Sequence, residues 1–421
     1  MNPLYNLGIR AYAAAVRLAA ISNSKAAKLT AGQRNTLARL RDGLAAGNGP
    51  VVWVHAASLG EFEQGRPLIE RLRREQPGVR IVLSFFSPSG YEVRKDYPLA
   101  DAVVYLPFDT PRRVRKFIDA VNPREVYFIK YEFWGNYLQE LSRRKIPVYL
   151  VSAIFRPTQS FFKPWGGTFR DMLRSLRHIF VQDEESRRLL AGIGVTAVTV
   201  AGDTRFDRVA AVRSTPCKVE GIERVMTPDC FRFVAGSSWP EDERIYLPWL
   251  DSQPGMKFII APHEFDAVRL DRLVAALPHR RVMLMSRWID AGKPADIDGL
   301  VVDSFGLLSS LYRYGDVAYI GGGFGAGIHN INEAAVYGMP VIFGPEHHKF
   351  REARGLMECG GGYEVAGPES FTGVVTRLQS NPQALAAAGQ AAGDYIRDNL
   401  GATDRVYESV YGTPDTVHTS R

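Results

Sequence analysis

Glycines and polar side chains occur together in the segment Gly321 to Ala335, which has the sequence GGGFGAGIHNINEAA. The apolar run Val317 to Ile320 precedes it and predicts a strand, and the residues after the glycines predict a helix. A helix N-terminus presents unpaired backbone N–H groups and the positive end of the helix dipole. The segment therefore predicts a phosphate-binding loop, with His329, Asn330 and Glu333 on the first turn of the helix beside the anion.

A second group of polar residues, in the segment HAASLGEFE, follows the apolar run Val51 to Val54. Glu61 lies where the following helix should start, and a carboxylate there could take a proton from an attacking hydroxyl group. Ser58 and Glu61 also have the S-x-x-E spacing of a capping box, which requires no catalysis. The spacing leaves both interpretations open, and Asn330 and Glu333 share the same spacing and the same ambiguity.

Further polar side chains follow other predicted strands. Each one alone is typical of a solvated loop, but several cations at the ends of parallel strands would together attract an anionic ligand. These residues are Lys130 and Glu132 after the run ending at Ile129, Arg205 after the run ending at Ala201, Ser237 and Ser238 after Phe231 to Gly236, and His263 after Phe258 to Pro262.

Short apolar runs alternate with amphipathic helical stretches along most of the chain. In the first half the runs extend from Val51 to Ala201, and a second series extends from Phe231 to Phe343. This alternation predicts βαβ units and parallel sheets covered on both faces. The stretch Arg208 to Asp229 shows little periodicity and separates the two series, which is typical of a linker between domains.

We therefore predict an α/β chain with two doubly wound domains, whose ligands bind at the carboxyl ends of the strands and in a central cleft between the domains. The predicted segments are an N-terminal helix (1–22), a first domain (23–209), a linker (210–229), a second domain (230–395) and a C-terminal helix that packs back on the first domain (396–421).

The N-terminal segment Met1 to Ser22 has no acidic residue and carries only Arg10 and Arg17, which fall near one face of a helix. Its pattern matches neither a secretory signal nor a spanning helix of about 20 apolar residues. It is typical of a helix that lies in the membrane interface, with the following basic residues against anionic headgroups. The alternative is a helix packed on its own domain, and deletion of the segment would distinguish the two.

Composition restricts the class of protein. The 421 residues are 46% hydrophobic and 23% charged, as in globular proteins of two or three domains. The three cysteines lie far apart without metal-type spacing, which indicates free thiols in a reducing compartment. The net charge of +7 fits an anionic partner. Because the aromatic residues do not alternate with basic ones, we expect a lipid surface and an anionic substrate as partners, and no nucleic acid.

The glycine segment also matches a loose dinucleotide-binding pattern, with Glu346 about 20 residues further on. In dinucleotide enzymes this loop usually follows the first strand of its domain, whereas several predicted strands precede it here. The chain has no Walker A lysine motif and no H-E-x-x-H motif. The sequence therefore disfavours an oxidoreductase.

Taken in order, the motifs resemble the Kdo transferases over nearly the whole chain. The matching segments are the lipophilic N-terminus, HAASLGEFE, KYEFWGN, VQDEESRRLLAGIGVTAVTVAGDTRFD and GGGFGAGIHNINEAAVYGMPVIFGP. These bacterial enzymes have a GT-B fold, with two Rossmann-like domains, and move 3-deoxy-D-manno-octulosonic acid (Kdo) from CMP-Kdo to a lipid A precursor. The resemblance implies an inverting glycosyltransferase of lipopolysaccharide biosynthesis at the cytoplasmic face of the inner membrane.

The resemblance also implies roles for individual residues. Glu61 corresponds to the family's general base, and Arg205 to a basic residue, commonly lysine, that faces the donor. The family usually has an acidic residue where Lys130 stands, so the contact with the lipid headgroup would differ here. The implied acceptor or cleft residues are Ser58, Gly60, Lys130 and Glu132, and the implied donor-binding residues are Arg205, Ser237, His263, Gly322, Gly323, Asn330 and Glu333.

The implied mechanism is a single displacement through an oxocarbenium-like state. Glu61 takes the proton of the acceptor hydroxyl, while Arg205 and the glycine loop stabilise the departing CMP, so no metal or other cofactor is expected. One alternative is another GT-B glycosyltransferase that uses a UDP-sugar. A second is a non-catalytic membrane protein that binds a nucleotide sugar. Replacing Glu61 with Gln abolishes turnover only in an enzyme.

Overall fold

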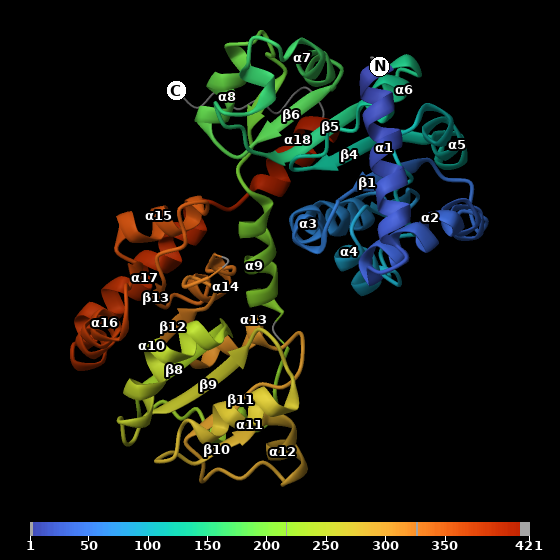
Figure 1. The fold of residues 1–421 in the computed structure, drawn as a ribbon. Coiled ribbons are helices and arrows are strands. Elements are labelled where there is room, and N and C mark those ends of the chain that lie inside the picture. Colours follow the sequence, from blue (N-terminus) through green and yellow to red (C-terminus); the bar gives the residue numbers. More distant parts are fainter. Residues whose placement is uncertain (1–2, 216, 326, 413–421) are drawn as a thin grey trace. The chain divides into compact units, whose positions relative to one another are not determined.

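The computed structural model describes residues 3–215, 217–325 and 327–412, and the chain divides into two compact units (Figure 1). Unit 1 comprises Met1–Arg208 and Leu400–Arg421, and unit 2 comprises Val209–Asn399. Each unit contains one seven-stranded parallel sheet flanked by helices. The predicted α/β class with two doubly wound sheets is confirmed.

The sheet of unit 1 consists of the strands expected from the apolar runs. They are β1 (Val51–His55), β2 (Arg80–Phe85), β3 (Ala102–Tyr105), β4 (Pro123–Ile129), β5 (Val148–Ala153), β6 (His178–Val181) and β7 (Val198–Val200). Their spatial order is β3-β2-β1-β4-β5-β6-β7. The order reverses between β1 and β4, so the loops after these two strands diverge and leave room for a ligand at that point.

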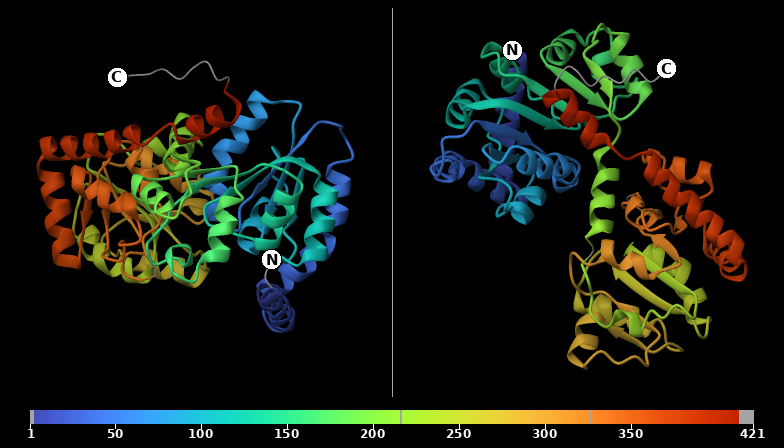
Figure 2. Two further views of the ribbon diagram at one scale, coloured as in Figure 1. Left: turned by 90° about the horizontal axis from the view of Figure 1, so that it is seen from above. Right: turned by 180° about the vertical axis from the view of Figure 1, so that it is seen from behind.

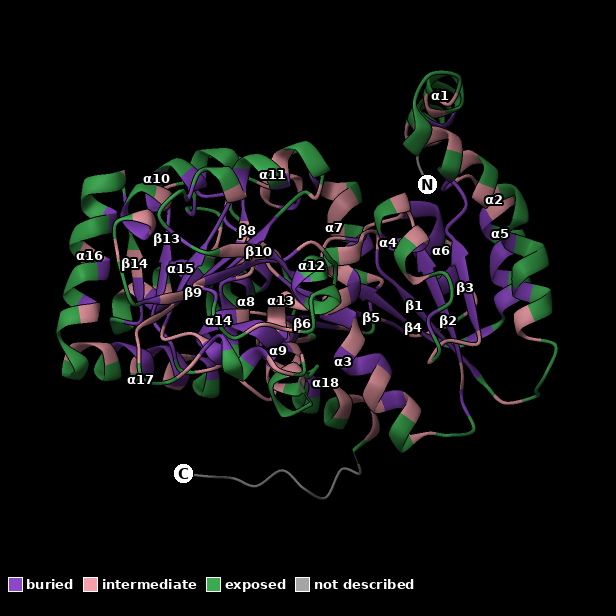
Figure 3. Cartoon of the chain, turned by 90° about the horizontal axis from the view of Figure 1, so that it is seen from below, coloured by how far each residue is buried: buried purple, intermediate pink, exposed green. Residues whose placement is uncertain are grey.

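Two hydrophobic cores cover the two faces of this sheet, because successive residues of a strand point to opposite faces. Val51 and Trp53 belong to one core, and Val52 and Val54 belong to the other. Figure 3 shows the strands buried between helices whose outer surfaces are exposed. Among the helices that contribute to the first core are α5 (Pro111–Val121), α6 (Gly135–Arg143), α7 (Gly167–Arg174) and α8 (Glu184–Ala191), and among those of the second are α3 (Leu59–Glu75), α4 (Pro88–Arg94) and α18 (Ala402–Tyr411).

The predicted N-terminal helix is present as α1 (Pro3–Ala19), followed by α2 (Ser24–Gly43); residues 1–2 of the predicted segment lie outside the described residues. Helix α1 buries Ala13 against unit 1, and much of its surface is exposed (Figure 3). In the described part of the chain, no helix has the length and apolar content that crossing a membrane requires. Association of α1 with a membrane stays a prediction.

The sheet of unit 2 repeats this plan with a different strand order, β10-β11-β9-β8-β12-β13-β14, which reverses between β8 and β12. The sequence did not predict β14, because the glycine-rich segment that forms this edge strand lacks an apolar run. The strands are β8 (Arg232–Ser238), β9 (Lys257–Pro262), β10 (Val282–Leu284), β11 (Gly299–Val301), β12 (Val317–Ile320), β13 (Val341–Phe343) and β14 (Gly362–Glu364).

Helices α10 (Pro240–Asp251), α11 (Ala267–Ala275) and α16 (Pro368–Ser380) share one core with the strands of unit 2. Phe233, Phe258 and Tyr319 are the fully buried aromatic residues that the strands contribute to it. The remaining described helices of unit 2 are α12 (Met285–Asp290), α13 (Leu308–Leu311), α14 (Asn332–Ala335), α15 (Arg351–Cys359) and α17 (Pro382–Asp398), with the short 3-10 turns η2 (Ile222–Arg224) and η3 (Tyr312–Tyr314). Unit 1 contains the 3-10 turn η1 (Ser160–Phe162).

The predicted linker, 210–229, differs from the structure. Helix α9 (Thr204–Ser214) continues into it, and the residues after α9 belong to unit 2. Ile222, Val225 and Met226 are buried, so this stretch packs within unit 2. It forms a 3-10 turn and loops, which explains why its apolar residues show no regular spacing. The predicted linker also includes Pro216, which lies outside the described residues.

The C-terminal part of the chain returns to unit 1 through α18, which packs against α3 (Figures 1 and 2). Asp207 of α9 caps α18, because its carboxylate accepts the backbone N–H groups of Gly401 (2.7 Å) and Thr403 (2.6 Å) and the Thr403 hydroxyl (2.6 Å). Tyr127 of β4 donates to the Tyr411 hydroxyl (2.9 Å). Residues 413–421 of the predicted C-terminal segment lie outside the described residues.

Replacing Asp207 with Ala should loosen α18, because the first N–H groups of that helix lose their acceptor. We expect the free energy of unfolding of unit 1 to fall by about 1–3 kcal/mol. Hydrogen exchange measured by mass spectrometry should be faster in 402–411 than in the native protein. The control Asp290→Ala changes an exposed carboxylate of α12 and should alter stability by less than about 0.5 kcal/mol. Unchanged exchange in α18 would contradict the capping role.

Candidate functional site

Predicted site residues of both units lie at the carboxyl ends of the strands that flank each reversal of strand order. In unit 1, Ser58, Gly60 and Glu61 follow β1, and Lys130 and Glu132 follow the neighbouring strand β4. In unit 2, Ser237 lies at the end of β8, and the glycines from Gly321 follow the neighbouring strand β12. These are the places where open α/β sheets bind ligands.

Glu61 forms the capping box that its spacing from Ser58 predicts. Its Oε2 accepts the backbone N–H (3.0 Å) and the hydroxyl (3.3 Å) of Ser58, and its own N–H donates to the Ser58 Oγ (3.5 Å). A Cβ added at Gly60, the preceding residue, would meet no atom within 4 Å, so the space over the start of α3 is open. The capping box thus orients the same carboxylate that is the predicted base.

The surroundings of Glu61 make it a stronger base than an ordinary glutamate. Burial raises the pKa of Glu61, and repulsion from the Glu132 carboxylate raises this pKa further. Attraction to His55, the backbone hydrogen bond from Ser58 and the charge of Lys130 act in the opposite direction. A carboxylate whose pKa is raised by burial and a second carboxylate is typical of a functional site.

Hydrogen bonds from the protein core hold Glu132 in place. The Glu132 Oε2 contacts the His55 Nε2 (3.0 Å) and accepts the indole N–H of Trp134. His55 is fully buried, and its Nδ1 contacts the Ser84 carbonyl oxygen (3.0 Å) and Oγ (2.8 Å). Sequence reasoning did not select His55 as a site residue, although a polar residue that ends an entirely buried strand could have drawn attention to it.

Arg205 belongs to the same edge of unit 1. The Asp203 carboxylate accepts the backbone N–H and the Nε of Arg205, each at 2.9 Å, and the Gln64 amide at 3.0 Å. Burial by itself would raise the pKa of Asp203, but the charge and hydrogen bonds of Arg205 lower it below its ordinary value. Arg205 is therefore a fixed cation at the start of α9.

Charged groups of this edge, including Arg205 and Glu61, act together on the phenol of Tyr131. Burial raises the pKa of its phenol, the cations of Arg156 and Arg205 oppose that shift, and the carboxylates of Asp203 and Glu61 add to it. Sequence reasoning missed Tyr131 and Arg156. Arg156 lies in the loop after β5, where a single cation in a loop gives no distinctive pattern.

Three non-glycine residues at or just after strand ends have a left-handed backbone. Their φ angles are 68° at Lys130, 54° at Ser152 and 53° at Ser237. Such residues carry backbone strain that persists only where the surrounding structure fixes it, and they are frequent at ligand sites. The Lys130 ammonium group lies 5.2 Å from the centre of the Tyr131 ring. The assignment of Lys130 and Ser237 to a ligand stays a prediction.

The glycine segment of unit 2 differs from the predicted helix N-terminus. Helix α14 has only four residues, so Glu333 lies in it, but His329 and Asn330 precede it and their predicted place on its first turn is wrong. The Asn330 amide donates to the Glu333 carboxylate (3.1 Å). A single turn sums few peptide dipoles, so an anion bound here would depend on the loop. Ala326 of this segment lies outside the described residues.

Several N–H groups of the loop already have acceptors within unit 2. The backbone N–H of Gly322 donates to the Asp242 carboxylate (2.8 Å), and the backbone N–H of His329 donates to the Gly321 carbonyl oxygen (3.1 Å). A Cβ at Gly321 would lie 2.3 Å from the Ser237 carbonyl oxygen, and one at Gly323 would lie 2.5 Å from a backbone nitrogen of the loop after β13. The glycines are therefore required first for close packing of this loop against its neighbours.

Asp242 is a residue that sequence reasoning missed. It lies on the first turn of α10, and its carboxylate accepts the Tyr319 hydroxyl (2.9 Å) and the backbone N–H groups of Trp239 (2.9 Å) and Gly322. Burial raises the pKa of Asp242, and the three hydrogen bonds oppose that rise. One buried carboxylate thus ties the end of β12, the glycine loop and the start of α10 together.

Three aromatic rings stack beside the glycine loop. The centroids of Trp239 and His263 lie 4.4 Å apart with an interplanar angle of 26°, and those of His263 and His329 lie 4.6 Å apart with an angle of 33°. The Trp239 indole N–H donates to the His329 Nε2 (3.2 Å). Burial, with a smaller contribution from the charge of His263, lowers the pKa of His329 to about 4. His329 is therefore neutral at neutral pH, with its proton on Nδ1.

Nitrogen-15 NMR should show His329 as the Nδ1–H tautomer at neutral pH and should give a titration midpoint near 4. Because this pKa lies below the unfolded value of 6.5, the contribution to stability is full above pH 6.5 and is lost as the pH falls towards 4. Trp239→Phe keeps a stacked ring but removes the indole donor, so the tautomers should mix. His329→Gln assigns the resonance. A proton on Nε2 in the native protein would contradict this geometry.

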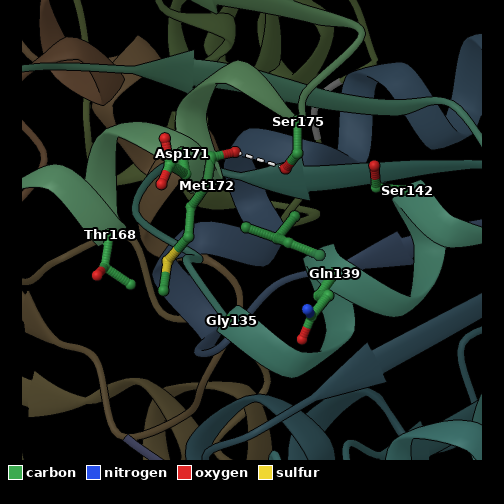
Figure 4. Close-up of a pocket in the computed structure, with 8 residues that line it drawn as sticks. Gly135, Gln139, Ser142, Thr168, Asp171, Met172 and Ser175 are labelled. Atoms are coloured by element: carbon green, nitrogen blue, oxygen red, sulfur yellow. Dashed lines mark hydrogen bonds between the residues drawn. The ribbon is translucent and has the colours of Figure 1, made fainter. Parts of the chain in front are cut away.

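A cavity of about 410 Å³ lies elsewhere in unit 1, between α6 and α7 (Figure 4). None of the predicted site residues lines it, and Asp171 is the one ionisable residue among those that do, so we do not assign the reaction to this cavity. Its lining residues are Gly135, Leu138, Gln139, Ser142, Thr168, Asp171, Met172 and Ser175.

Comparisons with known proteins agree with these observations. A family model described as 3-Deoxy-D-manno-octulosonic-acid transferase (kdotransferase) matches residues 27–208. The 3-deoxy-D-manno-octulosonic acid transferase of Bordetella pertussis is 27% identical over 411 residues and covers 91% of this chain and 93% of the relative. The protein of the same name from Chlamydophila psittaci is 26% identical over 375 residues, which is 86% of this chain and 85% of the relative.

Solved structures share the fold at lower identity. The UDP-GlcNAc 2-epimerase of Neisseria meningitidis has a TM-score of 0.62 and 15% identity, over 86% of this chain and 100% of the epimerase. MurG of Acinetobacter baumannii has a TM-score of 0.55 and 13% identity, over 86% of this chain and 100% of MurG. This likeness bears on the fold alone and confirms the predicted GT-B class. The family model and the relatives of that name, which cover most of the chain's length, show that the chain is similar to 3-deoxy-D-manno-octulosonic acid transferases.

Proposed function

We propose that the chain is an inverting glycosyltransferase that transfers Kdo from CMP-Kdo to a lipid A precursor in lipopolysaccharide core biosynthesis. The similarity to 3-deoxy-D-manno-octulosonic acid transferases supports the reaction class. The single observation that carries the mechanism is the oriented Glu61 carboxylate, whose pKa is raised by burial and by Glu132 where the strand order of unit 1 reverses. We assign it the role of general base, as the resemblance in sequence implies.

In the proposed reaction, a hydroxyl oxygen of the acceptor forms a bond to the anomeric carbon of Kdo. The bond from that carbon to the phosphate oxygen of CMP breaks, with the electron pair leaving on CMP, through an oxocarbenium-like state. Glu61 takes the hydroxyl proton, a contribution of about 10²- to 10⁴-fold in rate. The capping box with Ser58 holds the Glu61 carboxylate in one orientation, so little reorganisation precedes the proton transfer.

Fixed cations would neutralise the negative donor. Kdo carries a carboxylate and CMP carries a phosphate, and Arg205 is held rigidly by the buried Asp203. A charge held in place before the reaction stabilises a leaving phosphate without reorganisation, which makes a protein-only mechanism chemically sufficient. We assign Arg205, Ser237, His263, Gly322, Gly323, Asn330 and Glu333 to the donor, and Ser58, Gly60, Lys130 and Glu132 to the acceptor.

We also propose that α1 holds the enzyme on anionic lipid at the cytoplasmic face of the inner membrane. Leu4, Leu7 and Leu18 recur on one side of the helix and are 74%, 64% and 69% exposed. Arg10 and Arg17 are exposed on the same helix and can meet anionic headgroups. An exposed apolar stripe with basic neighbours favours a helix that lies in the interface.

Glu61→Gln should lower the transfer of labelled Kdo by about 10²- to 10⁴-fold, because the amide cannot accept the hydroxyl proton. The assay generates CMP-Kdo in place and uses a tetraacyl lipid A precursor. The matched control Glu70→Gln changes a glutamate of the same helix that pairs with Arg66 (2.7 Å) and should retain activity. Since the pKa of Glu61 is raised from 4.5, the native kcat/KM should fall towards acid pH with a midpoint above 4.5.

The outcomes separate the proposal from its alternatives. A native protein that transfers a sugar from a UDP donor but none from CMP-Kdo would be a different glycosyltransferase. A native protein that binds CMP and transfers neither sugar would be a binding protein. Full activity of the folded Glu61→Gln variant would refute the assignment of the base.

Changing Leu4, Leu7 and Leu18 together to Ser should reduce binding to phosphatidylglycerol vesicles by more than about tenfold, because each buried leucine contributes about 1.5–3 kcal/mol. Co-sedimentation measures the bound fraction. The matched control changes three exposed apolar residues of unit 2, Val268, Ile289 and Phe305, to Ser and should bind as the native protein does. Undiminished binding of the α1 variant would exclude α1 as the membrane contact.

A further inference from the structure

Helix α6 begins without a cap from its own sequence. The residue before it, Trp134, makes no side-chain cap, and the first N–H groups of a helix need acceptors. The Gly135 N–H donates to the Tyr5 hydroxyl (3.0 Å), and the N–H groups of Asn136 and Tyr137 donate to the Asp109 carboxylate, each at 3.0 Å. A residue of α1 therefore completes the N-terminus of α6.

The contact between α1 and α6 is polar and specific. The Tyr5 hydroxyl donates to the fully buried Asp109 carboxylate (2.6 Å) while it accepts from Gly135, so both roles of the hydroxyl are in use. The side-chain carbonyl oxygen of Asn6 accepts a hydrogen bond from the side-chain amide of Asn136 (2.8 Å). Loss of the Tyr5 hydroxyl would leave the Gly135 N–H without this acceptor in a part-buried place.

Trp134 connects this cap to the candidate site. Its indole N–H donates to Glu132 and lies 3.3 Å from the His55 Nε2. Its ring packs on Phe86 with centroids 4.8 Å apart, and Phe86 stacks with Tyr12 of α1 at 6.5 Å. Helix α1 therefore reaches Trp134 from two directions, through the backbone at Gly135 and through the ring of Phe86.

We propose that α1, seated on unit 1, positions Trp134 and through it Glu132 beside Glu61, and that Tyr5 is a positioning residue of the site. The same helix exposes its leucines on another side, so one rigid element carries both the surface meant for lipid and the support of the acidic pair. The catalytic consequence rests on the proposed function, whereas the link from Tyr5 to Trp134 does not.

Detachment of α1 should therefore change the chemistry of Glu61. The charged groups that act on the Glu61 carboxylate are Glu132, which raises its pKa, and His55 and Lys130, which lower it. If Glu132 moves away, the repulsion weakens and the pKa of Glu61 falls. The enzyme would then keep its fold and lose its stronger base.

The first test uses the full chain and no substrate. The protein has six tryptophans, and ¹H–¹⁵N NMR resolves their indole N–H groups, with Trp134→Phe assigning the resonance of Trp134. In Tyr5→Phe we expect this resonance to move, because the hydrogen bond of the indole to the Glu132 carboxylate changes. The matched control Tyr407→Phe removes a hydroxyl of α18 that accepts from Gln76 (3.4 Å) and should leave the resonance in place.

The second test measures transfer to a detergent-dispersed acceptor, which removes the need for membrane binding. Tyr5→Phe should lower kcat about tenfold through misplacement of the acidic pair, and the acid limb of kcat/KM should move to lower pH. Tyr407→Phe should change neither. A role of Tyr5 in stability alone would lower the melting temperature without moving the acid limb, and that result would overturn the catalytic part of the proposal.

A third variant keeps the test decisive if Tyr5→Phe folds poorly. Asn6→Ala removes only the contact with the Asn136 amide and should move the Trp134 resonance in the same direction by a smaller amount. An unmoved Trp134 resonance in both folded variants would overturn the proposed link, whatever reaction the protein catalyses. A moved resonance in a protein without transferase activity would support the link and refute the proposed function instead.

Discussion

The contact between the His55 Nε2 and the Glu132 carboxylate, at 3.0 Å, joins the two strands between which the order of the unit 1 sheet reverses. His55 ends β1 and Glu132 follows β4, so this one bond crosses the place where the flanking loops diverge. A carboxylate so deeply buried needs partners, and His55 and Trp134 supply them. The position of Glu132, and with it the basicity of Glu61, depends on this bond.

The corresponding place in unit 2 is built on a different physical basis. There one buried carboxylate, Asp242, accepts three donors, and the glycine loop closes on itself through its own backbone groups. Unit 1 thus holds two carboxylates, Glu61 and Glu132, that repel each other, and this repulsion favours proton transfer to Glu61. Unit 2 has a neutral histidine and a compact loop, which suit recognition more than proton transfer.

The sequence was sufficient to predict most strands of both sheets and the polar residues that follow them. Buried strands such as β1 are continuous apolar runs because both faces of a parallel sheet are covered, and polar residues after such runs fall at one edge. Glu61 could therefore be predicted as a site residue from the apolar run that precedes it. The single turn of α14, which is four residues long, could not be predicted because no residue pattern in the segment marks so early an end. Asp242, His55 and the Tyr5 contact with Asp109 depend on partners far apart in the chain, which no local pattern contains.

The capping of α18 by Asp207 has a consequence for biosynthesis. Unit 2 is continuous in sequence and is inserted within unit 1, whose helix α18 is made about 200 residues after its sheet. During translation, unit 2 can therefore close its core while unit 1 still lacks α18 and leaves Tyr127 and Asp207 without their partners. Unit 1 would be completed last, and the unfinished surface beneath α18 is the part of the nascent protein on which chaperones would act.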